Sequence, residues 1–217
     1  MSDESAGMRR PSRAVVASAL LLRVKFHCIA RLAPLVESNF NFIELGPRGT
    51  GKSYFYSEFT PYSTLISGGQ ATKATLFYNV LRRKIGLVGF WDTVAFDEVG
   101  GIKIKDPDTI QIMKDFMANG RFSRGVEVIA QASMAYVGNL DLSVEQIVNS
   151  EVHDLFQPLP KEFDLAIQDR FACYLPGWEL PKNSSEFLTD HGIGRSWMSA
   201  ARIKGRAEPR ATSAKYS

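Results

Sequence analysis

The feature that most constrains this chain is a glycine-rich stretch matching G-x-x-x-x-G-K-[ST], with Gly46, Gly51, Lys52 and Ser53 at the fixed positions. The alternating residues 39–45 before it predict a strand, and the residues after it predict a helix. In that context the glycines let backbone N–H groups point at phosphate oxygens, and the helix N-terminus favours the same anion. The pattern predicts a nucleoside-triphosphate site, against the alternative of a glycine-rich surface turn.

The predicted ATP-binding residues run continuously through this loop and into the helix. They are Gly46, Pro47, Arg48, Gly49, Thr50, Gly51, Lys52, Ser53 and Tyr54. Lys52 supplies a mobile positive charge for the β- and γ-phosphates, and the Ser53 hydroxyl is expected to coordinate Mg²⁺. ATP and Mg²⁺ are therefore the expected cofactors.

An acidic pair, Asp97-Glu98, ends the apolar segment 93–97, which predicts a buried strand. Because ligands of a parallel sheet lie at the carboxyl ends of its strands, both carboxylates should face the phosphate loop. Asp97 is expected to hold the Mg²⁺ shell through water, and Glu98 to polarise the attacking water as a general base. A second carboxylate favours hydrolysis; the alternative is a strand end that meets solvent.

Strands and helices alternate along the rest of the sequence. Further strands are expected at 63–67, 126–132, 134–138 and 171–175, and helices at 14–33, 52–59, 71–84, 108–119 and 160–168. The alternation predicts an α/β fold of the P-loop NTPase type, in which helices flank a mainly parallel sheet as three α/β/α layers.

Composition divides the chain into a core and two ends. We expect a disordered basic tail at 1–13, a leading helix and linker at 14–36, an ATPase core at 37–194 and a second disordered basic tail at 195–217. The net charge of +3, from 26 basic and 23 acidic residues, is too small to argue for nucleic acid or membrane by itself.

The cellular compartment is expected to be the cytoplasm, without membrane contact. The cysteines Cys28 and Cys173 lie far apart and form neither a disulfide framework nor zinc spacing. No apolar run approaches the ~18 residues of a membrane helix. Arg23 and Lys25 directly follow the apolar segment 14–22, which argues against an export signal.

Two later polar residues complete the predicted catalytic set of Lys52, Glu98, Asn139 and Arg170. Asn139 follows a predicted strand, where it could orient the lytic water or contact the γ-phosphate, or could simply belong to a turn. Arg170 precedes the last strand. It could stabilise transition-state charge in a neighbouring subunit's site, or pair on the surface with Asp169 or Asp164.

These motifs, in this order, resemble the AAA+ ATPases. Longer strings are similar to the Lon-related AAA+ proteins of BREX phage-defence systems, the BrxL family. They are the segments 39–53, 94–99, 111–117, 169–171 and 175–179, and the resemblance covers residues 31–194.

The resemblance implies a homo-oligomeric ring that binds DNA. It also implies that Asn139 stands at the sensor-1 position, that Arg170 acts in trans, and that segment 125–132 is a hairpin lining the ring channel. Four basic loop residues flank one predicted helix and could contact a polyanion, against the alternative of a solvated charged face: Lys103, Lys105, Arg121 and Arg124. The predicted hairpin gives added weight to Arg121 and Arg124 as DNA contacts.

Family members also carry an N-terminal region, a helical lid and a Lon-protease-like domain, which this sequence does not show. We therefore expect a truncated ATPase core without protease activity, with weakened nucleotide affinity and ring assembly. The leading hypothesis is ATP hydrolysis by a DNA-associated phage-defence protein. A nucleotide- or DNA-binding fragment without turnover is the second hypothesis, and a small-molecule kinase the third.

Overall fold

The computed structural model describes residues 13–67, 71–104 and 106–182, with only the backbone of residues 13–19. The predicted tail at 195–217, nearly all of the tail at 1–13, and Lys105 lie outside these described residues. Among the described helices, none is both long and apolar enough to cross a membrane.

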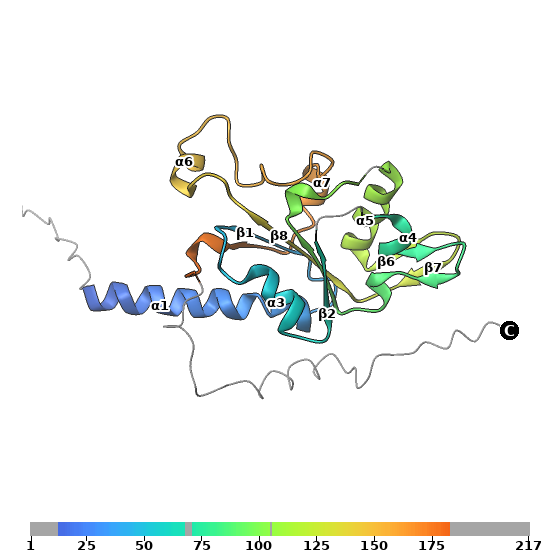
Figure 1. Cartoon of the computed structure of the whole chain (residues 1–217), viewed down its shortest axis with the longest axis horizontal. Helices are drawn as coiled ribbons and strands as arrows, with labels where there is room; N and C mark the ends of the chain where they lie inside the picture. The colour runs from blue at the N-terminus through green and yellow to red at the C-terminus, as the bar shows by residue number, and fades with distance from the viewer. Residues whose placement is uncertain (1–12, 68–70, 105, 183–217) are drawn as a thin grey trace, which may run out of the picture.

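A parallel sheet of five strands, in the order β2-β5-β8-β1-β9, forms the centre of the molecule (Figure 1). The strands are β1 (Phe42–Gly46), β2 (Ser63–Ser67), β5 (Thr93–Asp97), β8 (Ser133–Asn139) and β9 (Cys173–Pro176). Every neighbouring pair in this sheet is parallel. Because β1 lies between β8 and β9, the chain reverses direction across the sheet at β1, which is where ligands of open α/β sheets bind.

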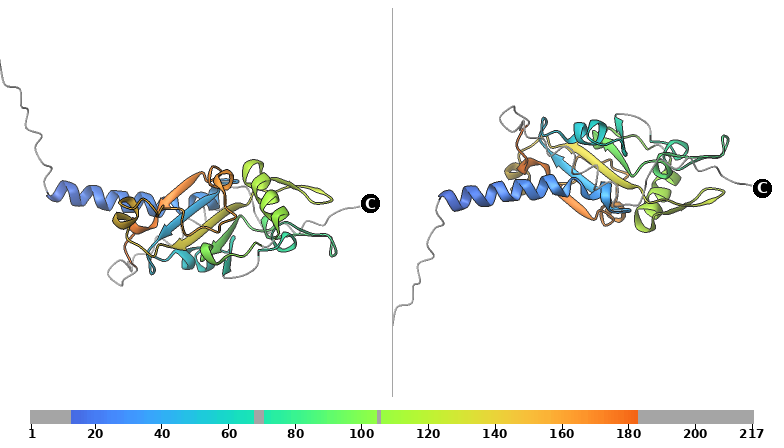
Figure 2. Two further views of the ribbon diagram at one scale, coloured as in Figure 1. Left: turned by 90° about the horizontal axis from the view of Figure 1, so that it is seen from above. Right: turned by 90° about the horizontal axis from the view of Figure 1, so that it is seen from below.

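Helices cover both faces of the sheet, which confirms the α/β/α prediction (Figure 2). On one face, α1 (Arg13–Ala30), α2 (Ala33–Val36) and α3 (Lys52–Glu58) pack with β1 through a cluster that includes Leu35, Phe42 and Phe55. On the other, α4 (Lys73–Leu76), α5 (Pro107–Asn119) and α7 (Leu165–Gln168) cover a larger cluster that includes Met113 and Tyr136.

The alternation of polar and apolar residues before Gly46 does not give β1 one solvent-exposed face and one buried face. All five residues of the strand are buried, because the helices cover both sides of this central strand. Its polar member, Glu44, is therefore a buried carboxylate rather than the surface residue that an alternating pattern suggests.

The predicted helix 71–84 is wrong. Only α4 is helical there, and the chain then forms the antiparallel hairpin β3 (Tyr78–Asn79) and β4 (Lys84–Ile85). Phe77 ends the helical turn because its ring packs between Phe116 and Phe122, with centroids 5.8 and 5.1 Å away. Leu81, at the hairpin tip, is 97% exposed.

Other boundaries also differ from prediction. Segment 126–132 contributes β7 (Glu127–Ile129), which pairs with β6 (Arg121–Ser123) around Gly125 at φ 77°. The predicted helix 160–168 shortens to α7. The predicted helix 14–33 ends at Ala30, and a second helix, α2, begins at Ala33 with Pro34 in its first turn, where proline is tolerated. Unpredicted elements are α6 (Val144–Val148) and the 3₁₀ turns η1 (Leu87–Gly89), η2 (Val99–Gly101) and η3 (Gly177–Glu179).

Several predicted elements are confirmed with their ends. Strand β2 spans the predicted residues, and β5 ends at Asp97. Helix α5 begins after Asp106, whose side chain accepts from the Asp108 N–H, and ends at Gly120 with φ 65°. These are the capping signals that the sequence carries at both ends of the helix.

Candidate functional site

The phosphate loop leaves β1 at Gly46 and enters α3 at Lys52. Gly49 and Gly51 both have left-handed backbones, with φ 85° and 77°, which favour glycine. Gly46 is required by proximity instead, because a Cβ there would lie 2.4 Å from the carbonyl carbon of Gly177. The loop therefore has the curled backbone that the glycine pattern predicts.

Lys52 lies over this loop and is only 6% exposed. Its ammonium donates to the carbonyl oxygens of Gly46, at 3.1 Å, and Pro47, at 2.6 Å. Burial lowers the pKa of Lys52 below its ordinary value, while the Glu44 and Asp97 carboxylates oppose that shift. The lysine is thus held by neutral oxygens, which a phosphate could replace with a stronger charge-assisted contact.

The other loop residues differ in accessibility. Thr50 is buried, and its hydroxyl lies 3.5 Å from the carbonyl of Pro47. Ser53 is half-buried in the first turn of α3, whereas Arg48 and Tyr54 are exposed. Arg48 and Tyr54 are thus free to contact a ligand outside the cradle.

Asp97 ends β5 and Glu98 follows it, at the same edge of the sheet as the loop. Asp97 is half-buried, and its charge is near enough to Lys52 to influence the pKa of that lysine. The Glu98 backbone is left-handed, with φ 49°, and its N–H donates to Oδ1 of Asp97 at 3.0 Å. Glu98 itself is exposed. One carboxylate therefore faces the loop region, and the next is open to water.

Asn139 ends β8, between the strands that carry the loop and the acidic pair. It lies in register with Gly46, and the N–H of the following Leu140 points at the Gly46 carbonyl, 3.4 Å away. The structure therefore places Asn139 beside the loop, as expected of a residue that contacts the γ-phosphate or the attacking water.

Oxygen donors suited to Mg²⁺ lie at this edge. Ser53 is the second residue of α3 and carries a hydroxyl, and Asp97 is the last residue of β5 and carries a carboxylate. Mg²⁺ prefers such ligands together with water and phosphate. These two residues fit the predicted magnesium role.

Arg170 lies away from this edge. It precedes β9, whose first residue pairs with Phe42, so it lies near the amino end of β1 while the loop follows the carboxyl end. Its Nε donates to the Lys114 carbonyl at 2.9 Å, and its guanidinium also contacts the Ala166 carbonyl. Among the described residues it pairs with no carboxylate; Asp164 bonds Lys114 instead. Arg170 therefore does not belong to its own chain's loop site.

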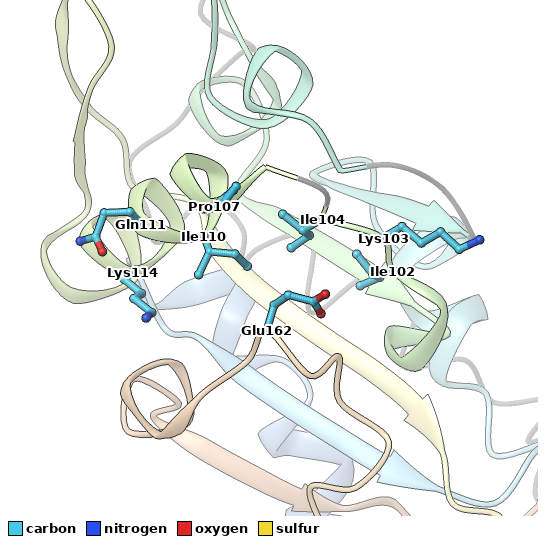
Figure 3. A pocket seen from close by; sticks show the side chains of 8 residues that line it. All are labelled: Ile102, Lys103, Ile104, Pro107, Ile110, Gln111, Lys114 and Glu162. Carbon is cyan, nitrogen blue, oxygen red and sulfur yellow. The ribbon is translucent and has the colours of Figure 1, made fainter.

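A cavity of about 650 Å³ lies elsewhere, and no phosphate-loop residue lines it. Figure 3 shows Ile102, Ile104 and Ile110 gathered around it, with Glu162 entering from the segment before α7. This cavity is not assigned to a nucleotide, because the phosphate loop, Asp97, Glu98 and Asn139 do not line it.

Sequence reasoning missed a buried ion pair beneath the loop. Arg31, just after α1, donates through Nε to Oε2 of Glu44 at 2.9 Å and through Nη2 to Oε1. Glu44 is fully buried and Arg31 is 8% exposed. The only sequence signal was a glutamate in the middle of an apolar strand.

A family model and two relatives of known name point to the same protein family. A family model described as "Lon-like protease BrxL-like, ATPase domain" matches residues 11–214, a wider range than the resemblance in the motifs. Proteins named Lon-like protease BrxL from Bacillus cereus and Escherichia coli are 57% and 56% identical over 170 residues. Both alignments cover 77% of this chain, but only 25% and 24% of the relatives, so the chain spans about a quarter of their length.

A solved structure, NtrX from Brucella abortus in complex with ATP, is a weaker match. It has a TM-score of 0.39 at 15% identity, over 81% of this chain and 39% of that one. A likeness at this level adds nothing to the fold described above.

Proposed function

Because the chain belongs to the family of BrxL-like ATPase domains, we propose that it binds ATP at residues 46–54 and hydrolyses it with Mg²⁺. The observation that carries the proposal is the meeting of the loop, Asp97 and Asn139 at one edge of the sheet, with Lys52 held over the loop. Glycines, lysine and carboxylates in that arrangement suit phosphoryl transfer to water.

In the proposed mechanism the loop N–H groups and Lys52 hold the β- and γ-phosphates. Glu98 accepts a proton from the attacking water, which its exposure allows, and Asn139 fixes the direction of that water or the γ-phosphate. Ser53 and, through water, Asp97 would hold Mg²⁺, which would supply positive charge to the phosphates. Arg170 is proposed to act on the site of a second copy in a ring, since it lies far from its own loop.

We further propose that the chain acts on DNA as part of a cytoplasmic phage-defence protein. Both views of Figure 2 show the hairpins β3–β4 and β6–β7 projecting from the same end of the molecule. Arg82, Arg83 and Lys84 are exposed on the first, and Arg121 on the second. Arg124 instead contacts the Tyr78 carbonyl, which ties the two hairpins together. These exposed bases, together with Lys103, fit a polyanion.

ATP turnover by the purified chain tests the enzymatic part. Glu98→Gln is the matched control, because it removes the general base while keeping size and hydrogen bonding. We expect it to bind ATP normally and to lose about a hundredfold or more in hydrolysis rate. Equal turnover in both proteins would contradict the proposal that this site hydrolyses ATP.

Two alternative functions predict different results. Nucleotide binding without turnover in the parent chain, and a monomer by light scattering, would favour a binding fragment. A small-molecule kinase would release ADP faster when an acceptor is added, whereas the proposed ATPase needs only water.

A further inference from the structure

The buried pair Arg31–Glu44 joins the leading segment of the chain to the strand that carries the phosphate loop. Both guanidinium contacts go to the two oxygens of one carboxylate, a bidentate arrangement. Glu44 stands two residues before Gly46, and its neighbours in the strand are apolar. Such an anion is tolerated in a buried strand only because a cation and hydrogen bonds compensate for its desolvation.

The pair lies within electrostatic range of Lys52. Glu44 raises and Arg31 lowers the pKa of that lysine, so both charges act on the ammonium. Helix α3 buries Lys52, Phe55 and Tyr56 together, so one face of the helix presents Lys52 and Tyr56 toward β1. The phosphate-binding lysine and the Glu44 carboxylate therefore share one enclosed region.

Two further groups lie around Glu44, and neither carries a positive charge. The Tyr56 hydroxyl is completely buried and has no hydrogen-bond partner among the described residues, and burial followed by the Glu44 carboxylate raises its pKa. Gly177 closes the other side, where a Cβ would lie 3.2 Å from Oε1 of Glu44. Among the described residues, Arg31 bonds this carboxylate and Lys52 is a second cation on which its charge acts.

We propose that Arg31 is a positioning residue for the triphosphate: it occupies the Glu44 carboxylate and so prevents that buried anion from capturing Lys52. The Lys52 ammonium then stays with the neutral carbonyls of Gly46 and Pro47, from which ATP can withdraw it. The inference rests on the proposed function, since it takes ATP to be the ligand of this loop.

This role makes α1 part of the nucleotide site rather than a leading helix and linker. A second contact supports that connection, because Arg23 and His27 of α1 both pair with Glu179 in η3, which directly follows β9. The helix is therefore fixed to the two adjacent strands β1 and β9, at the edge from which the phosphate loop leaves.

Reciprocal substitutions separate positioning from mere structural support. Arg31→Met leaves a free anion beside Lys52, whereas Glu44→Gln leaves a cation beside the loop. Both break the pair, and both are expected to lower the melting temperature of the full 217-residue chain. Only Arg31→Met should weaken Mg-ATP binding, by about tenfold or more in calorimetric titration at a temperature where each variant is folded.

The double variant Arg31→Met/Glu44→Gln supplies the rescue. With no carboxylate left to capture Lys52, its ATP dissociation constant should return to within about twofold of the parent value. If Arg31→Met alone does not fold, the double variant compared with Glu44→Gln decides, because losing Arg31 must then have no effect on affinity.

Three outcomes would overturn the inference. They are an Arg31→Met variant that binds ATP as tightly as the parent, a Glu44→Gln variant weakened as much as Arg31→Met, and a double variant about tenfold weaker than Glu44→Gln. A parent chain that binds no ATP would instead contradict the proposed function, and the inference with it.

Discussion

The Lys52 ammonium donates to the Pro47 carbonyl at 2.6 Å, so the charge expected to meet a phosphate is held by the loop's own backbone. A second bond, to Gly46, fixes it at the start of the loop. Because both acceptors are neutral, an anionic phosphate can replace them with a stronger interaction. Within the part of the chain that the structure describes, the loop therefore keeps its lysine buried in place without an ion pair that ATP would have to break.

Removing that lysine should weaken nucleotide binding with little damage to the fold. Lys52→Ala is expected to raise the dissociation constant for Mg-ATP by at least about tenfold, since it deletes the charge-assisted contact. Calorimetric titration measures the effect, with Lys161→Ala, a change at an exposed lysine, as the control. Equal affinity in the Lys52 variant and the parent would contradict the assigned site.

ATP binding should take up protons at alkaline pH. Burial lowers the pKa of Lys52 from its ordinary value of 10.5 in the free protein, whereas a phosphate beside the ammonium would favour the charged form and raise it. Between the two values, binding therefore protonates the lysine. Titrations in buffers of different ionisation enthalpy measure the uptake. Lys52→Arg, which stays charged throughout, should show none; equal uptake in that variant would assign the proton to another group.

Arg170 should act between copies rather than within one. We expect Arg170→Ala to keep ATP binding but to lose about a thousandfold in turnover, as for an arginine finger. Mixing it with Glu98→Gln should restore part of the activity, because mixed rings contain sites with an intact Glu98 facing an intact Arg170. A mixture as inactive as its components would contradict action in trans. Arg170→Lys controls for lost bonds to the Lys114 and Ala166 carbonyls.

The parts of the fold that sequence predicted are those where local signals agree with tertiary demands. β1, the loop and α3 are specified within one short stretch, and α5 carries Asp106 and Gly120 as caps. The strand β5 is a largely apolar run in which every residue before Asp97 is buried. In these places no distant residue had to be known.

The errors arise where distant contacts decide. Residues 71–84 have apolar residues at helical spacing, Phe77 among them. The Phe77 ring instead packs with Phe116 from α5 and Phe122 from β6, and the chain after it forms the hairpin β3–β4. The pair Arg31–Glu44 joins two elements that no periodic pattern links. The members of the candidate site could be grouped from sequence motifs alone. Each lies at the carboxyl end of a strand in a parallel sheet, and those ends share one edge.

Exposed bases on the hairpin β3–β4 should contribute to DNA binding. No acidic residue occurs between Glu58 and Asp92, so the charges of Arg82 and Arg83 are not offset within their own segment. Arg82→Gln/Arg83→Gln is expected to weaken binding to duplex DNA and to reduce the slope of log affinity against log salt by about two, as for two lost phosphate contacts. Fluorescence anisotropy over a salt series measures both quantities.

The matched control for this hairpin is Lys161→Gln/Lys182→Gln, which removes the same charge from two other exposed positions. If DNA contacts the hairpin, the control keeps the parent's salt slope, because neither lysine lies on β3–β4. If both double variants lose the same slope, binding follows net charge alone and the hairpin has no special part in it. An unchanged slope in the Arg82/Arg83 variant would place the DNA on another surface.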